Sequence, residues 1–365
     1  MNRRRVQIAV WLLAWAVFAS ASLAQEQAQK KEPAEKKEES KPAGPQVQDI
    51  VINLYNPCGV AVQPKTGHVY IADSGNLRLL RFTPGKGEQA PSIAEAVVGF
   101  PKDVYGKGPK YDIGPLGLLF VSDNLLAVGG GGNPDGKEVL WFFDVSQIKD
   151  KPIQTDAAKY TAGPIPPGEK TNRGEGNFYA LTLAAGAVYV TTNGDDTKGW
   201  VARCPIKDGT PGKLEPAIAT KPQVEVDAPV GITTSPKGKL VVGQAGEINV
   251  PEDSLLTFYD PASGKLELKL ETPLYDIVAL AYHPKSGTLY ALDFAWMAPD
   301  KAGLYRLDVT TGEKPSLKVT KVLQLDKPTA MAFTPEGELY ITLIGTAKEG
   351  DKYTPGKLIR VSGLK

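Results

Sequence analysis

Runs in which apolar and polar residues alternate recur from about residue 49 to the end of the chain. In each of six units, one such run is followed by a turn and a second run, as in "GVAVQPKTGHVYIAD" at 59–73. One small residue stands before the first run of every unit: Gly59, Gly117, Ala180, Gly231, Ala279 and Ala330. These residues are 48 to 63 positions apart, and an order repeated at such distances is typical of modular arrays. Alternation with period two, bounded by turns, predicts β-strands.

Each unit also contains a third predicted strand, as at 77–82 and 303–309, and several contain a fourth, as at 94–100 and 265–271. Four antiparallel strands in each of six units predict an all-β fold, a six-bladed β-propeller. The last unit ends without a fourth strand, whereas "DIVINLY" (49–55) precedes the first unit without a partner. We therefore expect 49–55 to form the outer strand of the last blade and to close the ring.

The first unit resembles an NHL repeat. The residues that carry this resemblance are Pro57, Gly59, Ala61, Pro64, Gly67, Tyr70, Asp73, Ser74, Gly75, Asn76 and Arg78. The chain is also distantly similar to propellers of the gluconolactonase/senescence-marker type and of strictosidine synthase. The resemblance covers 49–365 as architecture and implies the propeller fold, but it does not select one function.

The N-terminus has three arginines, an apolar stretch and a segment of small residues that ends at Ala24. This order predicts a secretory signal peptide over 1–24. The apolar stretch is shorter than the roughly 20 residues of a spanning helix, although an uncleaved anchor is the alternative. Residues 25–48 lack aromatic residues and are rich in Lys, Glu and Pro, which predicts a disordered charged linker. We expect a propeller over 49–365, exported to the periplasm or outside the cell, with no transmembrane segment in the mature chain.

The charge balance is nearly neutral, with 42 Lys and Arg residues against 41 Asp and Glu residues. No basic block interleaved with aromatic residues occurs, and nucleic-acid binding requires concentrated positive charge. We therefore expect no nucleic-acid partner.

Cys58 and Cys204 fall on blades that are not adjacent, so they are predicted to remain separate thiols.

Long predicted loops gather on one face of the propeller. They join the second and third strands of five units, at 129–138, 191–198, 243–253, 293–302 and 342–355. The segments that lead into the second and third units, 83–115 and 146–178, belong to the same face. Because loops on a rigid scaffold commonly carry binding sites, this face is the predicted site.

Six residues of this face form the predicted ligand-binding set. They are Asp73, Asn76, Asn193, Asp195, Asp293 and Trp296. Aromatic loop residues such as Tyr105, Trp296 and Tyr353 suit a protein, peptide or carbohydrate ligand, and the sequence does not choose among these.

The family resemblance raises the question of a metal, because gluconolactonase-type propellers hold a divalent cation near the axis with Glu, Asn and Asp. The motifs that supply these ligands are absent here, and Pro229-Val230-Gly231 stands where an asparagine would be expected. No cofactor is firmly implied. One interpretation is a Ca²⁺ site built from the loop residues Asp73, Asn193, Asp195, Asp196 and Asp293. The other is that these residues form turns in solvent.

Other candidate motifs are incomplete. His68 and His283 lie in turns on the opposite face and are too few for a catalytic zinc site, so we expect exposed turn residues. The loop "GGGGNPDGKE" approaches a phosphate-binding loop, but Glu138 stands where a hydroxyl is required and no helix follows. No nucleophile elbow G-x-S-x-G occurs.

The sequence therefore predicts an exported propeller that acts as a ligand- or protein-binding or scaffold module through its loop face, rather than an enzyme. The alternative is a divergent metal-dependent hydrolase or lactonase of the gluconolactonase-like type.

Overall fold

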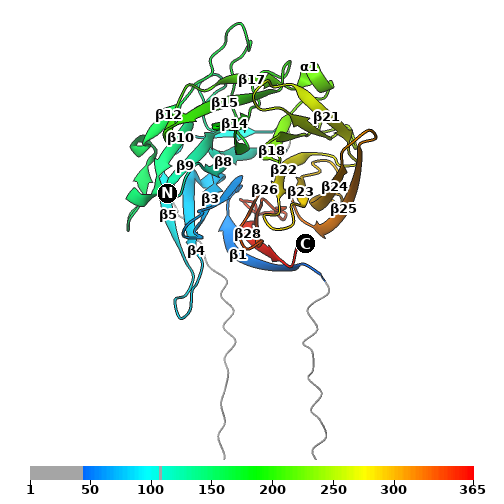
Figure 1. The fold of residues 1–365 in the computed structure, drawn as a ribbon. Coiled ribbons are helices and arrows are strands. Elements are labelled where there is room, and N and C mark those ends of the chain that lie inside the picture. Colours follow the sequence, from blue (N-terminus) through cyan, green and yellow to red (C-terminus); the bar gives the residue numbers. More distant parts are fainter. Residues whose placement is uncertain (1–43, 107–108) are drawn as a thin grey trace, which may run out of the picture.

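The computed structural model describes residues 44–106 and 109–365. Almost all regular structure in this part is β-strand, arranged as six four-stranded antiparallel blades in a ring (Figure 1). This confirms the predicted six-bladed β-propeller. The predicted signal peptide, and all of the linker before Gly44, lie outside the described residues.

The first three blades follow one another along the chain. Blade one contains β2 (Gly59–Val62), β3 (Val69–Asp73), β4 (Arg78–Thr83) and β5 (Ser92–Val98). Blade two contains β8 (Pro115–Phe120), β9 (Leu125–Gly130), β10 (Leu140–Asp144) and β12 (Tyr160–Ala162). Blade three contains β13 (Leu181–Ala184), β14 (Ala187–Thr191), β15 (Trp200–Lys207) and β17 (Glu215–Ala219).

The last three blades have the same internal order. Blade four contains β18 (Pro229–Thr234), β19 (Leu240–Gln244), β20 (Leu255–Tyr259) and β21 (Leu266–Glu271). Blade five contains β22 (Ile277–Tyr282), β23 (Leu289–Asp293), β24 (Gly303–Thr310) and β25 (Ser316–Gln324). Blade six contains β26 (Pro328–Phe333), β27 (Leu339–Leu343), β28 (Gly356–Ser362) and β1 (Gln46–Leu54).

The ring closes through the N-terminal strand. β1 pairs antiparallel with β28, from Gln46 opposite Ser362 to Leu54 opposite Gly356. The two strands lie side by side at the lower edge of Figure 1, although they come from opposite ends of the chain. The predicted closure is therefore confirmed, and the strand begins at Gln46, three residues before the predicted start at 49.

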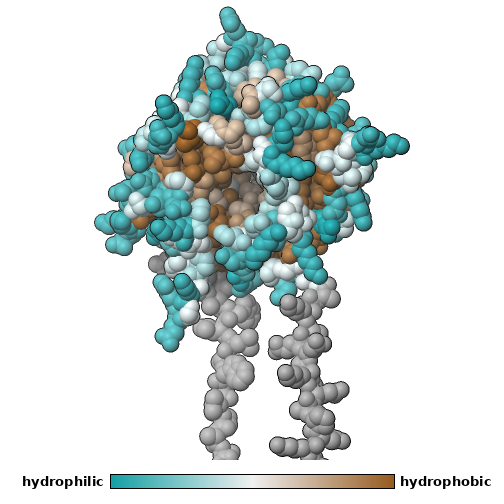
Figure 2. Space-filling view, viewed as in Figure 1, coloured by the Kyte–Doolittle hydropathy of each residue, from teal (hydrophilic) through white to brown (hydrophobic). Residues whose placement is uncertain are grey.

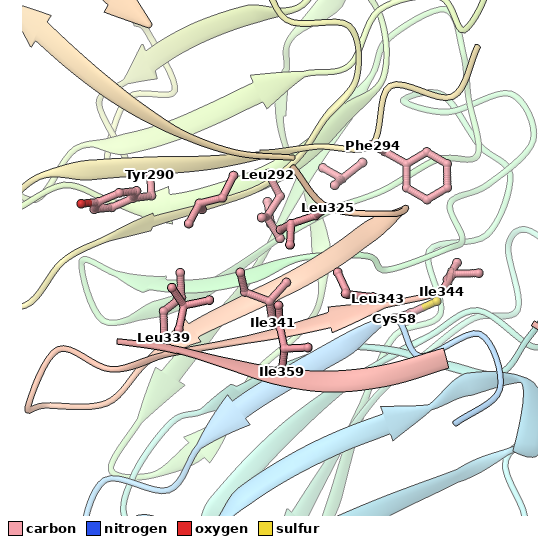
Figure 3. Close-up of a cluster of buried hydrophobic side chains, with 14 of the residues drawn as sticks. Cys58, Tyr290, Leu292, Phe294, Leu325, Leu339, Ile341, Leu343, Ile344 and Ile359 are labelled. Atoms are coloured by element: carbon pink, nitrogen blue, oxygen red, sulfur yellow. The ribbon is translucent and has the colours of Figure 1, made fainter. Parts of the chain in front are cut away.

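Each junction between neighbouring blades contains its own apolar cluster. At the junction of blades five and six, Leu292 and Phe294 pack with Leu339 and Ile341 (Figure 3). At the closing junction of blades six and one, Val51 and Leu358 pack with Val60, Ile71 and Leu80. The other four junctions have clusters of the same kind. The core is thus divided into six layers, and each blade is buried only by its neighbours.

The small residue at the start of each unit allows the inner strands to approach one another at the axis. A Cβ atom on Gly59 would lie 2.0 Å from the carbonyl oxygen of Leu116 in the next blade. A Cβ atom on Gly117 would lie 2.2 Å from the carbonyl oxygen of Tyr179. The repeated small residue is therefore a steric requirement of the ring at these two positions.

Several short elements lie outside the blades. The hairpin of β6 (Asp103–Tyr105) and β7 (Tyr111–Ile113) follows blade one. The remaining elements are β11 (Ile153–Gln154), β16 (Thr210–Pro211), the helix α1 (Lys221–Val224) and the 3₁₀ turns η1 (Ser74–Asn76), η2 (Val145–Gln147) and η3 (Thr155–Ala157). The segments 83–115 and 146–178 thus contain short strands and are not simply loops.

Among the described residues, no helix has the length and apolar character needed to cross a membrane.

The histidines and cysteines occupy the predicted elements. Both cysteines are buried and unpaired, which confirms the prediction of separate thiols. His283 lies in a turn as predicted, but the expectation of exposure is wrong because its side chain is 6% exposed. Its Nδ1 accepts hydrogen bonds from the backbone N–H groups of Lys285 and Ser286, and its ring packs on Phe333. The imidazole therefore stabilises the turn.

The closing junction can be tested at Leu54, which is 1% exposed in β1. Leu54→Ala is expected to lower the free energy of unfolding by about 2–5 kcal/mol, because it leaves a cavity where the ring closes. Val47→Ala, in the same strand but 48% exposed, is expected to change it by less than about 0.5 kcal/mol. Urea denaturation of both variants measures the difference. A small effect at Leu54, similar to that at Val47, would contradict closure by β1.

Candidate functional site

A cavity of about 140 Å³ lies on the axis at the end where the long loops gather. In every blade, the residue that precedes the small residue of the repeat lines this cavity. These residues are Cys58, Leu116, Tyr179, Val230, Val278 and Thr329. Loop residues such as Ile248 and Trp296 line it as well. Figure 2 shows one face of the molecule, where apolar residues surround a recess near the centre of the ring, inside a hydrophilic rim. The predicted loop face is therefore the face on which this cavity lies.

A hydrogen bond across the axis forms the floor of the cavity. The hydroxyl of Tyr179 in blade three donates to the carbonyl oxygen of Thr329 in blade six at 2.8 Å. Thr329 Oγ1 donates in turn to the carbonyl oxygen of Pro57 in blade one at 2.6 Å. Tyr179, Val278 and Thr329 also line a second cavity of about 310 Å³ at the opposite end of the axis. The tyrosine thus separates the two ends of the central channel.

Aromatic side chains form one wall of the cavity. Trp296 follows blade five's β23, and its ring centroid lies 5.0 Å from that of Phe294 and 5.6 Å from that of Tyr111. Tyr105, on the hairpin β6–β7, lies 6.3 Å from Trp296 and accepts a hydrogen bond from Asn193 Nδ2 of blade three at 3.1 Å. The hairpin therefore bridges blades three and five beside the cavity.

One carboxyl group lines this largely apolar cavity. Asp276 is 6% exposed, and its Oδ2 accepts a hydrogen bond from the backbone N–H of Trp296 at 2.6 Å. No cation and no donor to Oδ1 is found among the described residues. Burial raises the pKa of Asp276 to about 7, and the nearby charges of Asp293 and Asp253 act in the same direction. Near neutral pH this group is thus divided between the acid and the carboxylate.

Asp293 positions Asp276. The Asp293 carboxylate is fully buried and accepts hydrogen bonds from the backbone N–H groups of Tyr275 at 3.0 Å and Asp276 at 2.8 Å. It also accepts one from the N–H of Ala295 at 3.0 Å. These bonds hold together the loop that carries Asp276 and the loop that carries Trp296. The predicted site residue Asp293 therefore lies behind the cavity and orients two residues that line it.

The other predicted residues are divided between the site and its surroundings. Asn193 and Trp296 line the cavity, and Asp195 lines a groove that adjoins it. Asp73 and Asn76 lie elsewhere, and Asp73 accepts hydrogen bonds from Asn76 Nδ2, Arg78 Nε and the backbone N–H of Tyr55. The structure thus brings together Asn193, Asp195 and Trp296 but not the pair in blade one.

The alternative in which these acidic residues form turns in solvent is wrong for three of them. Asp73, Asp195 and Asp293 are at most 4% exposed. Each accepts backbone N–H groups from a neighbouring loop, as Asp195 Oδ2 does from Asn172 at 2.9 Å. A buried carboxylate needs such donors. These three residues therefore join the loops of the site face to one another.

The lining does not fit a divalent cation of the gluconolactonase kind. Such a cation requires several carboxylate or carbonyl oxygens around one point. Asp276 is the one acidic residue of the axial cavity, and one of its oxygens already accepts a backbone hydrogen bond. Within the described ranges, no group of three or more His, Cys, Asp or Glu side chains is arranged to hold a metal ion.

Glu138, in the loop that approaches a phosphate-binding motif, is fully buried. Its Oε1 accepts the backbone N–H of Asn133 at 2.6 Å, whereas Oε2 has no partner among the described residues. Burial raises the pKa of Glu138 to about 8. A buried acidic side chain in this loop disfavours phosphate, as the sequence predicted.

Sequence reasoning did not select Asp276, Tyr111 or Tyr179. Asp276 stands three positions before the small residue Ala279, and the equivalent position is Asn177 in blade three and Lys327 in blade six. An alignment of the six units at that position would have shown one acidic residue on the loop face. The hairpin that carries Tyr111 left no comparable signal, because it is an insertion outside the repeat.

Solved propellers share this fold over most of the chain. One is a glucose dehydrogenase, with 15% identity and a TM-score of 0.57, covering 87% of this chain and 100% of that chain. Another is a gluconolactonase from Xanthomonas campestris, with 14% identity, a TM-score of 0.55 and coverage of 87% and 89%. The WD40 propeller domain of Doa1 matches with 12% identity, a TM-score of 0.52 and coverage of 88% and 98%.

These similarities, at 12–15% identity, establish the propeller fold alone. No protein-family model matches the chain, and the search of curated proteins gave no match. Since proteins named as sugar enzymes and a WD40 domain match to a similar degree, the shared fold does not select one function.

The ionisation of Asp276 leads to a prediction about stability. Its folded-state pKa of about 7 lies above the ordinary value of 3.8, so the folded protein holds a proton that the unfolded chain releases. Its contribution to stability therefore falls as pH rises from about 4 to about 7. Asp276→Asn removes this dependence. From pH 5 to pH 8, the free energy of unfolding of the variant should rise by on the order of 2 kcal/mol relative to that of the wild type.

Urea denaturation of both proteins at the two pH values measures this gain. Asp123→Asn, at an exposed turn of the opposite face, is the matched control and should show no such gain. A constant difference between Asp276→Asn and the wild type at both pH values would contradict the protonated state of the buried carboxyl group.

Proposed function

We propose that the protein is an exported ligand-binding propeller whose axial cavity takes a ring-sized apolar group that carries a hydrogen-bond donor. The observation that supports this is the axial cavity itself. All six blades line it, its walls are apolar and aromatic, and its acidic side chain has a free oxygen. Export and the N-terminal linker are parts of the proposal that come from the sequence alone.

The size of the cavity limits the group that enters it. At about 140 Å³ it is close to an engineered apolar cavity of about 150 Å³ that admits benzene. Asn193, Val230 and Trp296 are half-buried, which leaves the cavity in contact with solvent. A single ring or a branched apolar group therefore fits, whereas a larger molecule has to extend out onto the loop face.

The polar groups of the cavity determine the orientation of the ligand. Asp276 Oδ1 accepts no hydrogen bond from the described residues, whereas Oδ2 is fixed by Trp296 N–H. A ligand that enters with its ring against Trp296 and Phe294 can donate to Oδ1. Pockets of this kind, with apolar walls and a few placed polar groups, are typical of small-molecule and side-chain recognition.

A hydrolase or lactonase is the second candidate, and one observation favours it. Asp276 is buried in the wall of the cavity with a pKa of about 7, which suits a general acid or base. The neighbours named gluconolactonase and glucose dehydrogenase have the same fold, but the metal-ligand set is not reproduced here. An enzyme of this kind would act through Asp276 on a small ester or lactone.

Binding can be tested with benzyl alcohol, which combines a ring with one hydroxyl donor. Ligand-observed NMR on the full chain should detect binding. Benzyl methyl ether, which lacks the donor, should bind about tenfold more weakly, because Asp276 then loses a hydrogen bond. Val230→Phe, which fills the cavity from β18, should abolish binding of both molecules.

Thr233→Phe is the matched control, because it adds the same ring at the other end of β18, beside the second cavity. Both variants are compared with the wild type by thermal melting to establish that they are folded. Binding that survives Val230→Phe, or equal affinity for the alcohol and the ether, would overturn the proposed role of the cavity.

The hydrolase candidate has its own assay. Turnover of glucono-lactone and of phenyl esters is measured with and without Ca²⁺ or Zn²⁺. If the second candidate holds, Asp276→Asn should lower kcat by at least about 100-fold. An absence of turnover under all these conditions, or turnover that Asp276→Asn leaves unchanged, would contradict it.

A further inference from the structure

The axial cavity continues into a groove between blades three and four. The groove has a volume of about 400 Å³ and follows the loop after β14, the segment around α1 and the loop after β19. Seven residues line both the cavity and the groove: Tyr105, Thr192, Asn193, Ala228, Pro229, Gly246 and Ile248. A ligand held in the cavity can therefore extend into the groove.

The groove is acidic. Its charged residues are Asp195, Asp196, Asp227, Glu247 and Lys221. Lys221 Nζ pairs with Asp227 Oδ2 at 2.7 Å and donates to the carbonyl oxygen of Asp196 at 2.8 Å, so this lysine is neutralised within the protein. The carboxylates of Asp195, Asp196 and Glu247 form no ion pair among the described residues. We call these five residues the acidic groove.

The three unpaired carboxylates differ in their surroundings. Burial disfavours ionisation of Asp195, but hydrogen bonds from Thr197 and Asn172 outweigh it and hold the pKa of Asp195 below its usual range. Lys198 contributes a positive charge near Asp195 but does not line the groove. Asp196 and Glu247 are exposed, with no hydrogen bond to their carboxylates from the described residues. These two side chains are free to bind a cation that arrives from solvent.

Exposed apolar side chains surround the same opening. Ile248 and Tyr105, which line both parts of the site, are 38% and 37% exposed. Val104 and Val250, their near neighbours in sequence, are 47% and 43% exposed, and Met297, beside Trp296, is 66% exposed. Five of the seven large apolar side chains that are exposed in the described chain thus lie in the loops around the cavity. Exposed apolar groups that gather in this way mark a surface for a macromolecular partner.

From these features we infer that the site binds a basic segment of a partner protein. One aromatic side chain that carries a hydrogen-bond donor, such as tyrosine, enters the axial cavity and donates to Asp276 Oδ1, and neighbouring Lys or Arg side chains of the segment lie in the acidic groove. The partner's backbone then covers the exposed apolar rim, which a ring-sized molecule alone would leave in water. This inference rests on the proposed binding role of the cavity and adds the class of partner.

The groove and the cavity supply different parts of the recognition. The aromatic anchor gives affinity by leaving water, as buried aromatic anchors do in protein interfaces. The acidic groove supplies specificity for charge and speeds encounter, since its carboxylates are partly exposed and their field reaches solvent. Affinity for such a segment should therefore fall as salt concentration rises.

The inference is tested by titrating the full chain with three acetylated, amidated pentapeptides in a calorimeter. Gly-Lys-Tyr-Lys-Gly carries the anchor and both charges, Gly-Gln-Tyr-Gln-Gly lacks the charges, and Gly-Lys-Ala-Lys-Gly lacks the anchor. The first peptide should bind at least about fivefold more tightly than the second. This difference in affinity should disappear at 1 M salt. The third should not bind measurably.

Variants of the protein then test whether the carboxylates of the groove cause the preference for the lysine peptide. The double variant Asp196→Asn/Glu247→Gln should weaken binding of the lysine peptide by about fivefold and leave the glutamine peptide unchanged. The control Asp123→Asn/Glu336→Gln removes the same charge from exposed turns of the opposite face and should change neither. Equal affinity for the lysine and glutamine peptides, or no effect of the groove variant, would overturn the inference.

The outcomes also separate this inference from the proposed function. If benzyl alcohol binds in the cavity but no peptide binds, the cavity function stands and the basic partner segment is wrong. If phenylethylamine binds as tightly as the lysine peptide, the ligand is a small organic cation and the protein partner is wrong. If neither benzyl alcohol nor any peptide binds, both proposals fail together.

Discussion

The structure depends on the burial of each blade by its two neighbours. A four-stranded blade has two apolar faces, and in this chain each face is covered by a separate cluster at a blade junction, such as that of Leu292 with Ile341. An open array of six blades would leave two faces in water, so the ring has to close. Pairing of β1 with β28 provides that closure and places Val51 and Leu358 against blade one.

Closure also creates the site. Six inner strands meet around an axis, and their backbones approach closely only where the repeat has a small residue, as at Gly59 against Leu116. The preceding residue of each unit then points to the axis, so the cavity receives one side chain from every blade. Tyr179 is long enough to reach the opposite blade and closes the floor at Thr329. The shape of the cavity is therefore set by the ring, and its chemistry by single residues on that ring.

The repeat carries most of the information about the fold, because strand alternation and the small residue are local and recur six times. It predicts the blades, the closing strand and the face on which the loops gather. The site is less predictable because its contacts are long-range. Tyr105 meets Trp296 of blade five and Asn193 of blade three through a hairpin that belongs to no repeat unit. No pattern near Tyr105 in the sequence indicates either partner.

Two buried aspartates of blade five show why residue type alone misleads. Asp293 accepts three backbone N–H groups, so its charge is satisfied by the protein and its role is to hold two loops together. Asp276 accepts one, lines the cavity and has no cation beside it among the described residues, so its remaining oxygen is available to a ligand. The number of donors that the fold supplies to each carboxylate, rather than its burial, therefore distinguishes the structural residue from the functional one. The donor to Asp276 is the N–H of Trp296, in a loop that Asp293 holds in place. The binding residue Asp276 therefore depends on the structural residue Asp293.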